Sequence, residues 1–197
     1  QSYLASAADL MIGLLFVFII MVAFLALQKK AEQEASDGDG DPRGTVTLVI
    51  GNEIKDTLKT VKIDPASGVI TLPEALLFDI GSSVLKDSAV DHLNETSQKL
   101  KVVLKCFVAN QRMGLKCEKN PYGHEIETIF VEGHTDSRPM NRNGGNTKLS
   151  LDRAISVSNA LLNGSGLADY KNSEDQPIFS YSAYAENRPL IKDDPTD

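Results

Sequence analysis

Residues 127–154 read ETIFVEGHTDSRPMNRNGGNTKLSLDRA, and this stretch decides the fold. Its first part, residues 127–133, predicts a strand. Residues 148–163 carry apolar side chains at helical spacing and are followed by Gly164, which predicts a helix that ends there. The side chains expected on the buried face of this helix are Leu151, Ala154, Ile155, Ser158 and Leu162.

The rest of the chain after residue 44 alternates between strand and helix patterns. The predicted strands are residues 45–50, a hairpin of 61–64 and 69–72 around a Pro-Ala-Ser-Gly turn, and a last strand at 177–184. A helix is predicted over residues 88–107, with a possible cap at Ser88 and Asp91 and an apolar face formed by Leu93, Leu100, Leu104 and Phe107. This alternation predicts an α/β sandwich with helices on one face of a sheet.

The N-terminal part of the chain is apolar. Residues 10–27 contain no charged residue, and at helical rise they come close to spanning a bilayer core of roughly 30 Å. The pattern predicts a single transmembrane helix over residues 1–28. Asp9 then has two explanations: it caps the helix near the headgroups, or it carries a proton or sodium ion and faces a helical partner. Because the first residue is Gln1, we expect further residues to precede it.

A polar linker, residues 29–44, separates this helix from the predicted domain of residues 45–197. Its alternating acids resemble the start of a calcium loop, but Pro42 stands where a Gly is needed and no Glu closes the loop at Leu48, so a solvated spacer is favoured. The net charge of -7 argues against a nucleic-acid partner. No catalytic arrangement and no metal spacing is apparent, so we expect a binding protein rather than an enzyme, without metal or cofactor.

The chain has two cysteines, Cys106 and Cys117, close together in the sequence. In an exported domain a disulfide between them can form and persist, and it would stabilise the fold by roughly 2 to 3 kcal/mol. The alternative is two unpaired thiols.

Polar residues gather in three segments, 131–136, 146–154 and 182–189. The motif Gly-His-Thr-Asp from Gly133, followed by Asn-x-x-Leu-Ser-x-x-Arg-Ala from Asn146, resembles the OmpA-like peptidoglycan-binding family. The earlier Leu77-Phe78-Asp79 is similar to another signature of that family, and the resemblance covers residues 71–190.

The resemblance implies a binding site for the cell-wall stem peptide. Asp136 and Arg153 would hold the ammonium and carboxylate of the diaminopimelate side chain, which suits a carboxylate and a guanidinium. Asn146 and Thr135 would add neutral hydrogen bonds, and Asp79 of the earlier signature would be a further peptidoglycan-binding residue. The alternative is that Asp136 and Arg153 pair with each other and brace the loop. His134 is expected to be a structural hydrogen-bonding residue.

A membrane helix followed by such a domain is similar to the B subunits of MotB-type stators, through Ala8-Asp9-Leu10-Met11 and the Gly-His-Thr-Asp-Ser-Arg-Pro run. This resemblance implies an ion-driven rotary motor in which Asp9 carries protons or sodium ions. Its partners would be a ring of a multi-pass A subunit of MotA or ZorA type, a second copy of the chain, the membrane and peptidoglycan. The protein would cross the bacterial inner membrane once, with a cytoplasmic N-terminus and a periplasmic domain.

Two departures bear on which branch of the family this is. Ala7 stands where MotB has a Tyr, and the linker is much shorter than in MotB. The short linker is similar to the B subunits of Zorya anti-phage defence systems, which we therefore expect. The alternatives are a flagellar stator subunit and a passive tether between inner membrane and wall.

Overall fold

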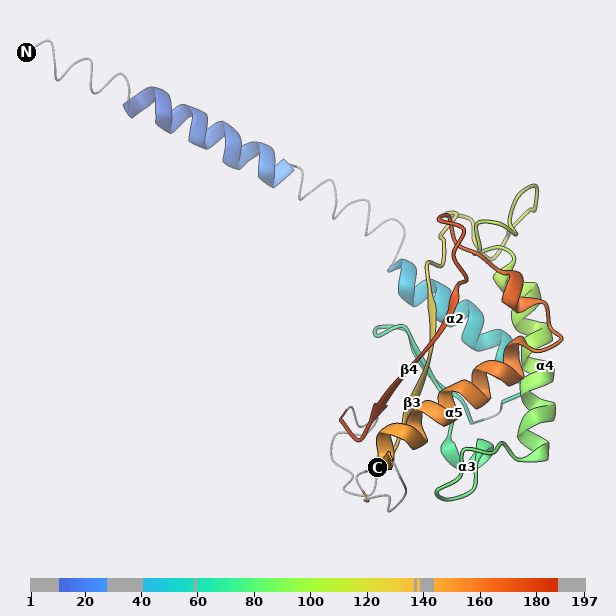
Figure 1. Cartoon of the computed structure of the whole chain (residues 1–197). Helices are drawn as coiled ribbons and strands as arrows, with labels where there is room; N and C mark the ends of the chain where they lie inside the picture. The colour runs from blue at the N-terminus through green and yellow to red at the C-terminus, as the bar shows by residue number, and fades with distance from the viewer. Residues whose placement is uncertain (1–10, 28–40, 59, 137, 139–143, 188–197) are drawn as a thin grey trace, which may run out of the picture. The chain divides into compact units, whose positions relative to one another are not determined.

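The computed structural model describes residues 11–27, 41–58, 60–136, 138 and 144–187. The chain divides into two compact units between Pro42 and Arg43, which are described separately. In the first unit residues 11–27 form one helix (Figure 1). Every large apolar side chain of this helix is exposed. Among the described residues no helix combines the length and apolarity needed to cross a membrane.

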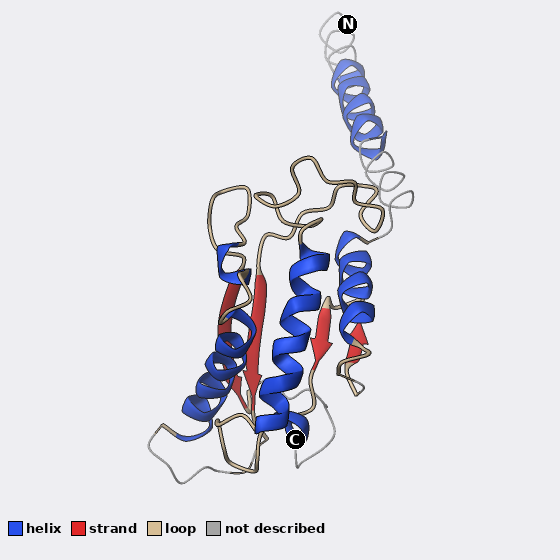
Figure 2. Cartoon of the chain, turned by 90° about the vertical axis from the view of Figure 1, so that its right-hand side faces the viewer, coloured by secondary structure: helices blue, strands red, loops and turns tan. Residues whose placement is uncertain are grey.

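The second unit is a mixed α/β domain, as predicted (Figure 2). Its elements in chain order are α2 (Pro42–Ile54), β1 (Lys62–Asp64), β2 (Val69–Thr71), α3 (Glu74–Leu77), α4 (Asp87–Leu104), β3 (Ile129–His134), α5 (Gly145–Leu162), the 3-10 turn η1 (Leu167–Asp169) and β4 (Phe179–Ala185). Over the described residues the strands form two separate pairs, β1 with β2 and β3 with β4, rather than the single sheet that the sequence predicts.

The pair that positions the site is β3 and β4. These strands run parallel, with Ile129 opposite Phe179 and Gly133 opposite Ala183, and α5 connects them and packs against both (Figure 1). The carboxyl ends of both strands therefore lie at the same edge, beside the start of α5. Three segments that are distant in sequence can meet there.

Helix α4 packs against α5 and supplies much of the core. The four residues expected on its apolar face, Leu93, Leu100, Leu104 and Phe107, are all buried. The helix ends at Leu104 rather than at the predicted residue 107, so Phe107 enters the core from the turn that follows it. The predicted cap is wrong: the N-cap residue is Lys86, and no side chain caps the helix. The hairpin is confirmed, with Ile63 opposite Ile70.

The strand predicted over residues 45–50 is wrong, because these residues lie in α2. The buried residues of α2 follow helical spacing: they are Gly44, Thr47, Gly51 and Ile54. The β-branched composition of the segment favours a strand, but strand propensity depends on context and packing overrides it here. The Thr47 hydroxyl donates to the Arg43 carbonyl at 2.7 Å, which satisfies a buried polar group within the helix.

Helix α5 begins at Gly145, three residues earlier than predicted, and its buried face agrees with the prediction only in part. Ala154 and Ser158 are buried as predicted, and Ile155 and Leu162 are half-buried. Leu151, predicted to be buried, is 37% exposed. The buried residues that the prediction did not include are Asn146, Ser150, Arg153, Val157 and Leu161. The prediction followed the leucines, whereas the helix turns polar Ser150 and Arg153 inward, and both take part in the site described below.

Candidate functional site

The ends of β3 and β4 and the first turns of α5 are joined by specific contacts. The Thr135 amide donates to the Ala185 carbonyl at 3.1 Å, and the Ala185 amide donates to the Ser150 hydroxyl at 3.3 Å. Gly133 allows this close approach, because a Cβ atom there would lie 1.9 Å from the Ser150 carbonyl oxygen. The structure thus brings together the three segments that the sequence singled out.

Arg153 projects from α5 toward the loop between α3 and α4. Its Nε donates to the Ser82 carbonyl at 2.9 Å, and one terminal nitrogen donates to the Glu74 carboxylate at 2.6 Å. The guanidinium also lies over the Phe78 ring, 5.2 Å from its centroid. Arg153 is buried, so this cation is held in a fixed orientation by one carboxylate, one carbonyl and one aromatic face.

Asp136 follows β3 and is half-buried. Its carboxylate accepts a hydrogen bond from the Arg138 amide at 3.1 Å and forms an ion pair with the Arg138 guanidinium. The hydrogen bond from the Arg138 side chain to Asp136 and the charge of Asp136 raise the pKa of Arg138, and Glu74 contributes a smaller electrostatic effect in the same direction. Asp136 is therefore an anion that already holds a cation.

The predicted alternative, in which Asp136 and Arg153 pair with each other, is not what the structure has. Asp136 pairs with Arg138, and Arg153 pairs with Glu74. The two residues keep separate partners, one cationic and one anionic.

Asn146 lies on the first turn of α5 and is buried. Its amide nitrogen donates to the Asp136 carbonyl at 3.2 Å and to the Arg138 carbonyl at 3.1 Å. Both N–H groups of this amide are therefore used to hold the backbone that carries the two charged side chains. In this structure Asn146 braces the site.

Thr135 is buried beside Asp136, and its hydroxyl has no hydrogen-bond partner among the described residues. Leaving a buried hydroxyl without a partner costs about 1 to 3 kcal/mol. A ligand that hydrogen-bonds to this hydroxyl would recover that cost, which fits the predicted role of Thr135.

Asp79 lies in the loop after α3 and is highly exposed, with its carboxylate 3.3 Å from the Lys86 ammonium. Its carbonyl accepts from the Ser82 amide at 2.9 Å, so Asp79 forms the turn that presents the Ser82 carbonyl to Arg153. The structure therefore gives Asp79 a place in the turn that contacts Arg153.

Sequence reasoning missed Glu74, Ser82 and Arg138. Glu74 is 79 residues from Arg153, and no local pattern links the two. The one available signal was the basic Arg138 two residues after Asp136.

The remaining polar residues near the site have structural contacts. His134 stacks on Tyr184 with ring centroids 5.6 Å apart, and its Nε2 lies 3.7 Å from the Glu132 carboxylate. This agrees with a structural His134. Within the described ranges no group of His, Cys, Asp and Glu side chains could hold a metal ion.

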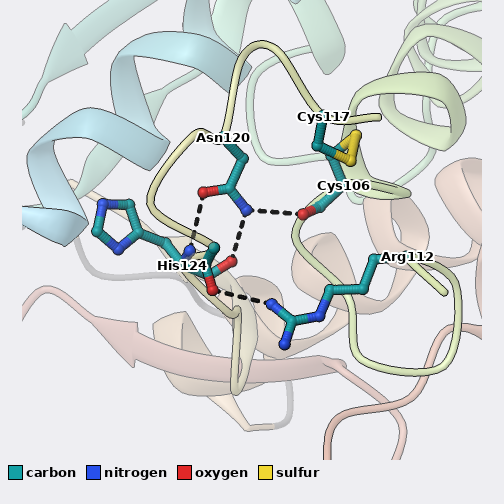
Figure 3. The surroundings of a disulfide bond; sticks show 6 residues. Cys106, Arg112, Cys117, Asn120 and His124 are labelled. Atoms are coloured by element: carbon teal, nitrogen blue, oxygen red, sulfur yellow. Dashed lines mark hydrogen bonds between the residues drawn. A yellow bond between two sulfur atoms is a disulfide. The ribbon is translucent and has the colours of Figure 1, made fainter. Parts of the chain in front are cut away.

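The cysteines are paired, as one of the two alternatives predicted. Cys106 and Cys117 form a disulfide with 5.5 Å between their Cα atoms (Figure 3). Asn120 fastens the same loop: its amide nitrogen donates to the Cys106 and His124 carbonyls at 2.7 and 2.8 Å, and its carbonyl accepts from the His124 amide. Arg112 donates to the Gly123 carbonyl at 2.8 Å.

Asp9, the predicted ion carrier, lies outside the described residues.

Comparisons with known proteins bear on the same part of the chain. Residues 117–197 match the OmpA family. The cell wall anchor of the T6SS from Pseudomonas aeruginosa is 20% identical, with a TM-score of 0.48 over 73% of this chain and 83% of that one. A MotB-like protein from Desulfovibrio vulgaris is 20% identical, with a TM-score of 0.46 over 77% of this chain and 83% of that one. No curated protein sequence matches the chain. Residues 117–197, with β3, α5 and β4, are thus an OmpA-like α/β region.

Proposed function

We propose that the domain anchors the protein to peptidoglycan by binding the zwitterionic end of the diaminopimelate side chain. The observation that carries this proposal is the geometry of Arg153. Its buried guanidinium is oriented by Ser82 and Phe78 and already binds a carboxylate, that of Glu74. Arg–carboxylate pairs are short and strong, and they suit recognition of a planar anion. Asp136 supplies the complementary anion for the ammonium group.

Three further observations support a ligand at this edge of the domain. Residues 117–197, which include Asp136 and Arg153, match the OmpA family. The buried Thr135 hydroxyl next to Asp136 has no partner among the described side chains and backbone groups. Asn146 holds the carbonyls of Asp136 and Arg138, which keeps the loop in place for binding.

The test is binding of a diaminopimelate-containing stem tripeptide to the full chain, measured by calorimetry. We expect Arg153→Lys to weaken binding about 10- to 100-fold, because an ammonium cannot reproduce the oriented guanidinium contacts and hydrogen bonds to charged groups are worth about 1.5 to 3 kcal/mol. The matched control is Arg112→Lys, which changes an arginine paired with Glu125 in the disulfide loop.

Binding that is equal in the wild type, Arg153→Lys and Arg112→Lys would contradict this site. A tripeptide in which lysine replaces diaminopimelate lacks the terminal carboxylate, and its failure to bind would confirm that the zwitterion is the recognised group.

We further propose that the chain is the B subunit of an ion-driven rotary motor in the bacterial inner membrane. The support is the uncharged run of residues 10–27 preceded by Asp9, together with the exposed apolar side chains of the helix over residues 11–27. A helix that is apolar on all sides requires lipid or a partner helix to cover it. In this proposal residues 1–28 cross the membrane once, Asp9 carries protons or sodium ions, and the domain is periplasmic.

The partners in this proposal are a ring of a multi-pass A subunit, a second copy of the chain, and peptidoglycan. The short linker favours a role in Zorya anti-phage defence over flagellar motility. The chain acts as a binder and ion carrier, not as an enzyme, and uses no cofactor.

A passive tether between membrane and wall is the second candidate function, and Asp9 distinguishes it from a motor. Asp9→Asn keeps the size and capping ability of the side chain but cannot carry a proton. If the chain is a motor subunit, this variant abolishes biological activity while peptidoglycan binding is retained. Asp37→Asn, in the linker, is the matched control. An active Asp9→Asn variant would establish the tether.

A further inference from the structure

The two predicted binding side chains each already hold a partner from their own chain. The Arg153 side chain is 6% exposed, whereas that of its partner Glu74 is 49% exposed. The Asp136 side chain is 20% exposed, whereas that of its partner Arg138 is 66% exposed. In each pair the predicted binding group lies deeper, and the partner reaches it from the surface.

The chemistry of these partners matches that of the proposed ligand. The carboxylate of Glu74 pairs with Arg153, to which the ligand's carboxylate would bind. The guanidinium of Arg138 pairs with Asp136, to which the ligand's ammonium would bind. Glu74 and Arg138 thus reproduce the two charges of the zwitterion.

The same helix holds both pairs: Asn146 of α5 donates to the Asp136 and Arg138 carbonyls, and Arg153 lies about two turns later on α5. Glu74 contributes to raising the pKa of Arg138, so Arg138 lies within electrostatic reach of both Asp136 and Glu74. The charges alternate in the order Asp136, Arg138, Glu74, Arg153. A zwitterion that enters this site can exchange with both internal partners without leaving either binding charge unpaired, which would be costly for the buried Arg153.

We propose that Glu74 and Arg138 occupy the two charge subsites of the free protein and are displaced when the diaminopimelate zwitterion binds. This inference rests on the proposed peptidoglycan-binding function. Glu74 and Arg138 are the more exposed members of their pairs, so water can solvate their charges once the ligand takes their places. The ligand must displace them, which lowers its affinity without preventing binding. Glu74 and Arg138 therefore set the affinity of the site and exclude ligands that carry only one of the two charges.

Neutralising either internal partner tests this inference. With the full chain and the stem tripeptide as the probe, we expect Glu74→Gln and Arg138→Gln each to tighten binding about two- to fivefold, because competition for the subsite is removed. The controls are Asp175→Asn and Lys171→Gln, which make the same charge changes in an exposed pair elsewhere. We expect their affinities to equal that of the wild type.

Weaker or unchanged binding in both Glu74→Gln and Arg138→Gln would overturn the inference, since it would make these residues ligand-binding groups or bystanders. The nuclear magnetic resonance signal of the Arg153 Nε–H group provides a measurement in the free protein. It should shift in Glu74→Gln but not in Asp175→Asn, and an unshifted signal would also overturn the inference.

These results separate the two proposals. If the wild type fails to bind the tripeptide while the Arg153 signal shifts as expected, the proposed function fails although the internal pairing stands. If the wild type binds and neither variant tightens binding, the proposed function stands and displacement is wrong.

Discussion

At the scale of single residues, the site depends on how closely β3 approaches α5. Gly133 meets the backbone of Ser150, and Ser150 in turn accepts a hydrogen bond from the Ala185 amide. The absence of a side chain at Gly133 therefore lets the end of β3 pack closely on α5, which in turn contacts the end of β4. The same contact explains why a glycine precedes the polar residues His134 and Thr135.

Replacing Gly133 with alanine should destabilise the domain. The added Cβ would lie 1.9 Å from a backbone oxygen, which cannot move aside as a flexible side chain could. Overpacking of this kind typically costs about 1 to 3 kcal/mol. The measurement is urea unfolding of Gly133→Ala, with Gly13→Ala as the control because a Cβ there meets nothing within 4 Å. Equal midpoints for the two variants would contradict the contact.

Tyr170 should make stability depend on pH in alkaline solution. Burial raises the pKa of Tyr170 above its ordinary value of 10.0, and its hydroxyl donates to the Lys101 carbonyl at 2.7 Å. Above pH 10.0 the unfolded state releases the phenol proton while the folded state keeps it. The free energy of unfolding should therefore be constant for this group below that pH and fall as pH rises through the folded-state pKa.

Tyr170→Phe checks this prediction. The variant should lose about 1 kcal/mol at neutral pH, the usual worth of a hydrogen bond, and should show a shallower fall in stability above about pH 10 than the wild type. Tyr181→Phe changes an exposed tyrosine on β4 and is the control. If the free energy of unfolding of Tyr170→Phe fell with pH as steeply as that of the wild type, the Tyr170 phenol would not be the cause of the alkaline loss of stability.

At the scale of elements, α2 and α5 show where sequence patterns mislead. Residues 45–50 have strand-like composition but form part of a helix whose buried residues recur at helical spacing. In α5 the leucines suggested one buried face, whereas the helix buries Ser150 and Arg153 and leaves Leu151 partly exposed. Apolar periodicity therefore identified part of the buried face, with Ala154 and Ser158, but omitted the two polar residues that the helix buries at the candidate site.

The loop between α4 and β3 is an element held by its disulfide. Removing the bond with Cys106→Ser and Cys117→Ser together should lower the free energy of unfolding by about 2 to 3 kcal/mol, because a short loop regains its freedom in the unfolded chain. Urea unfolding with and without a reducing agent measures this effect. The reductant should destabilise the wild type and leave the double variant unchanged; an insensitive wild type would mean that the bond contributes nothing.

At the scale of the whole molecule, the chain combines an apolar helix with a mixed α/β domain. The helix over residues 11–27 exposes its large apolar side chains, while the domain encloses its own core. The proposed membrane span therefore predicts that a charge in the middle of this helix is costly. Phe18→Asp should reduce membrane insertion by about 2.5 to 3.5 kcal/mol, whereas Phe18→Leu should not.

Alkaline extraction of membranes measures this difference as the fraction of chain that remains in the pellet. A pellet fraction that is the same for Phe18→Asp, Phe18→Leu and the wild type would remove the support for a membrane span and for the motor.

The sequence alone determined the α/β class, the hairpin and the apolar face of α4, because these follow from local periodicity and turn chemistry. Motif spacing also identified the segments that meet at the site, and the two nearby cysteines allowed for a disulfide. Only the tertiary structure decided the partners of the charged residues. Arg153 meets Glu74 across 79 residues of chain, and Asp136 holds Arg138. The Arg153–Glu74 contact depends on which faces of distant elements pack together, and no local pattern encodes that choice. Arg138 is close to Asp136 in the sequence, but only the folded structure shows that Asp136 pairs with Arg138 and not with Arg153.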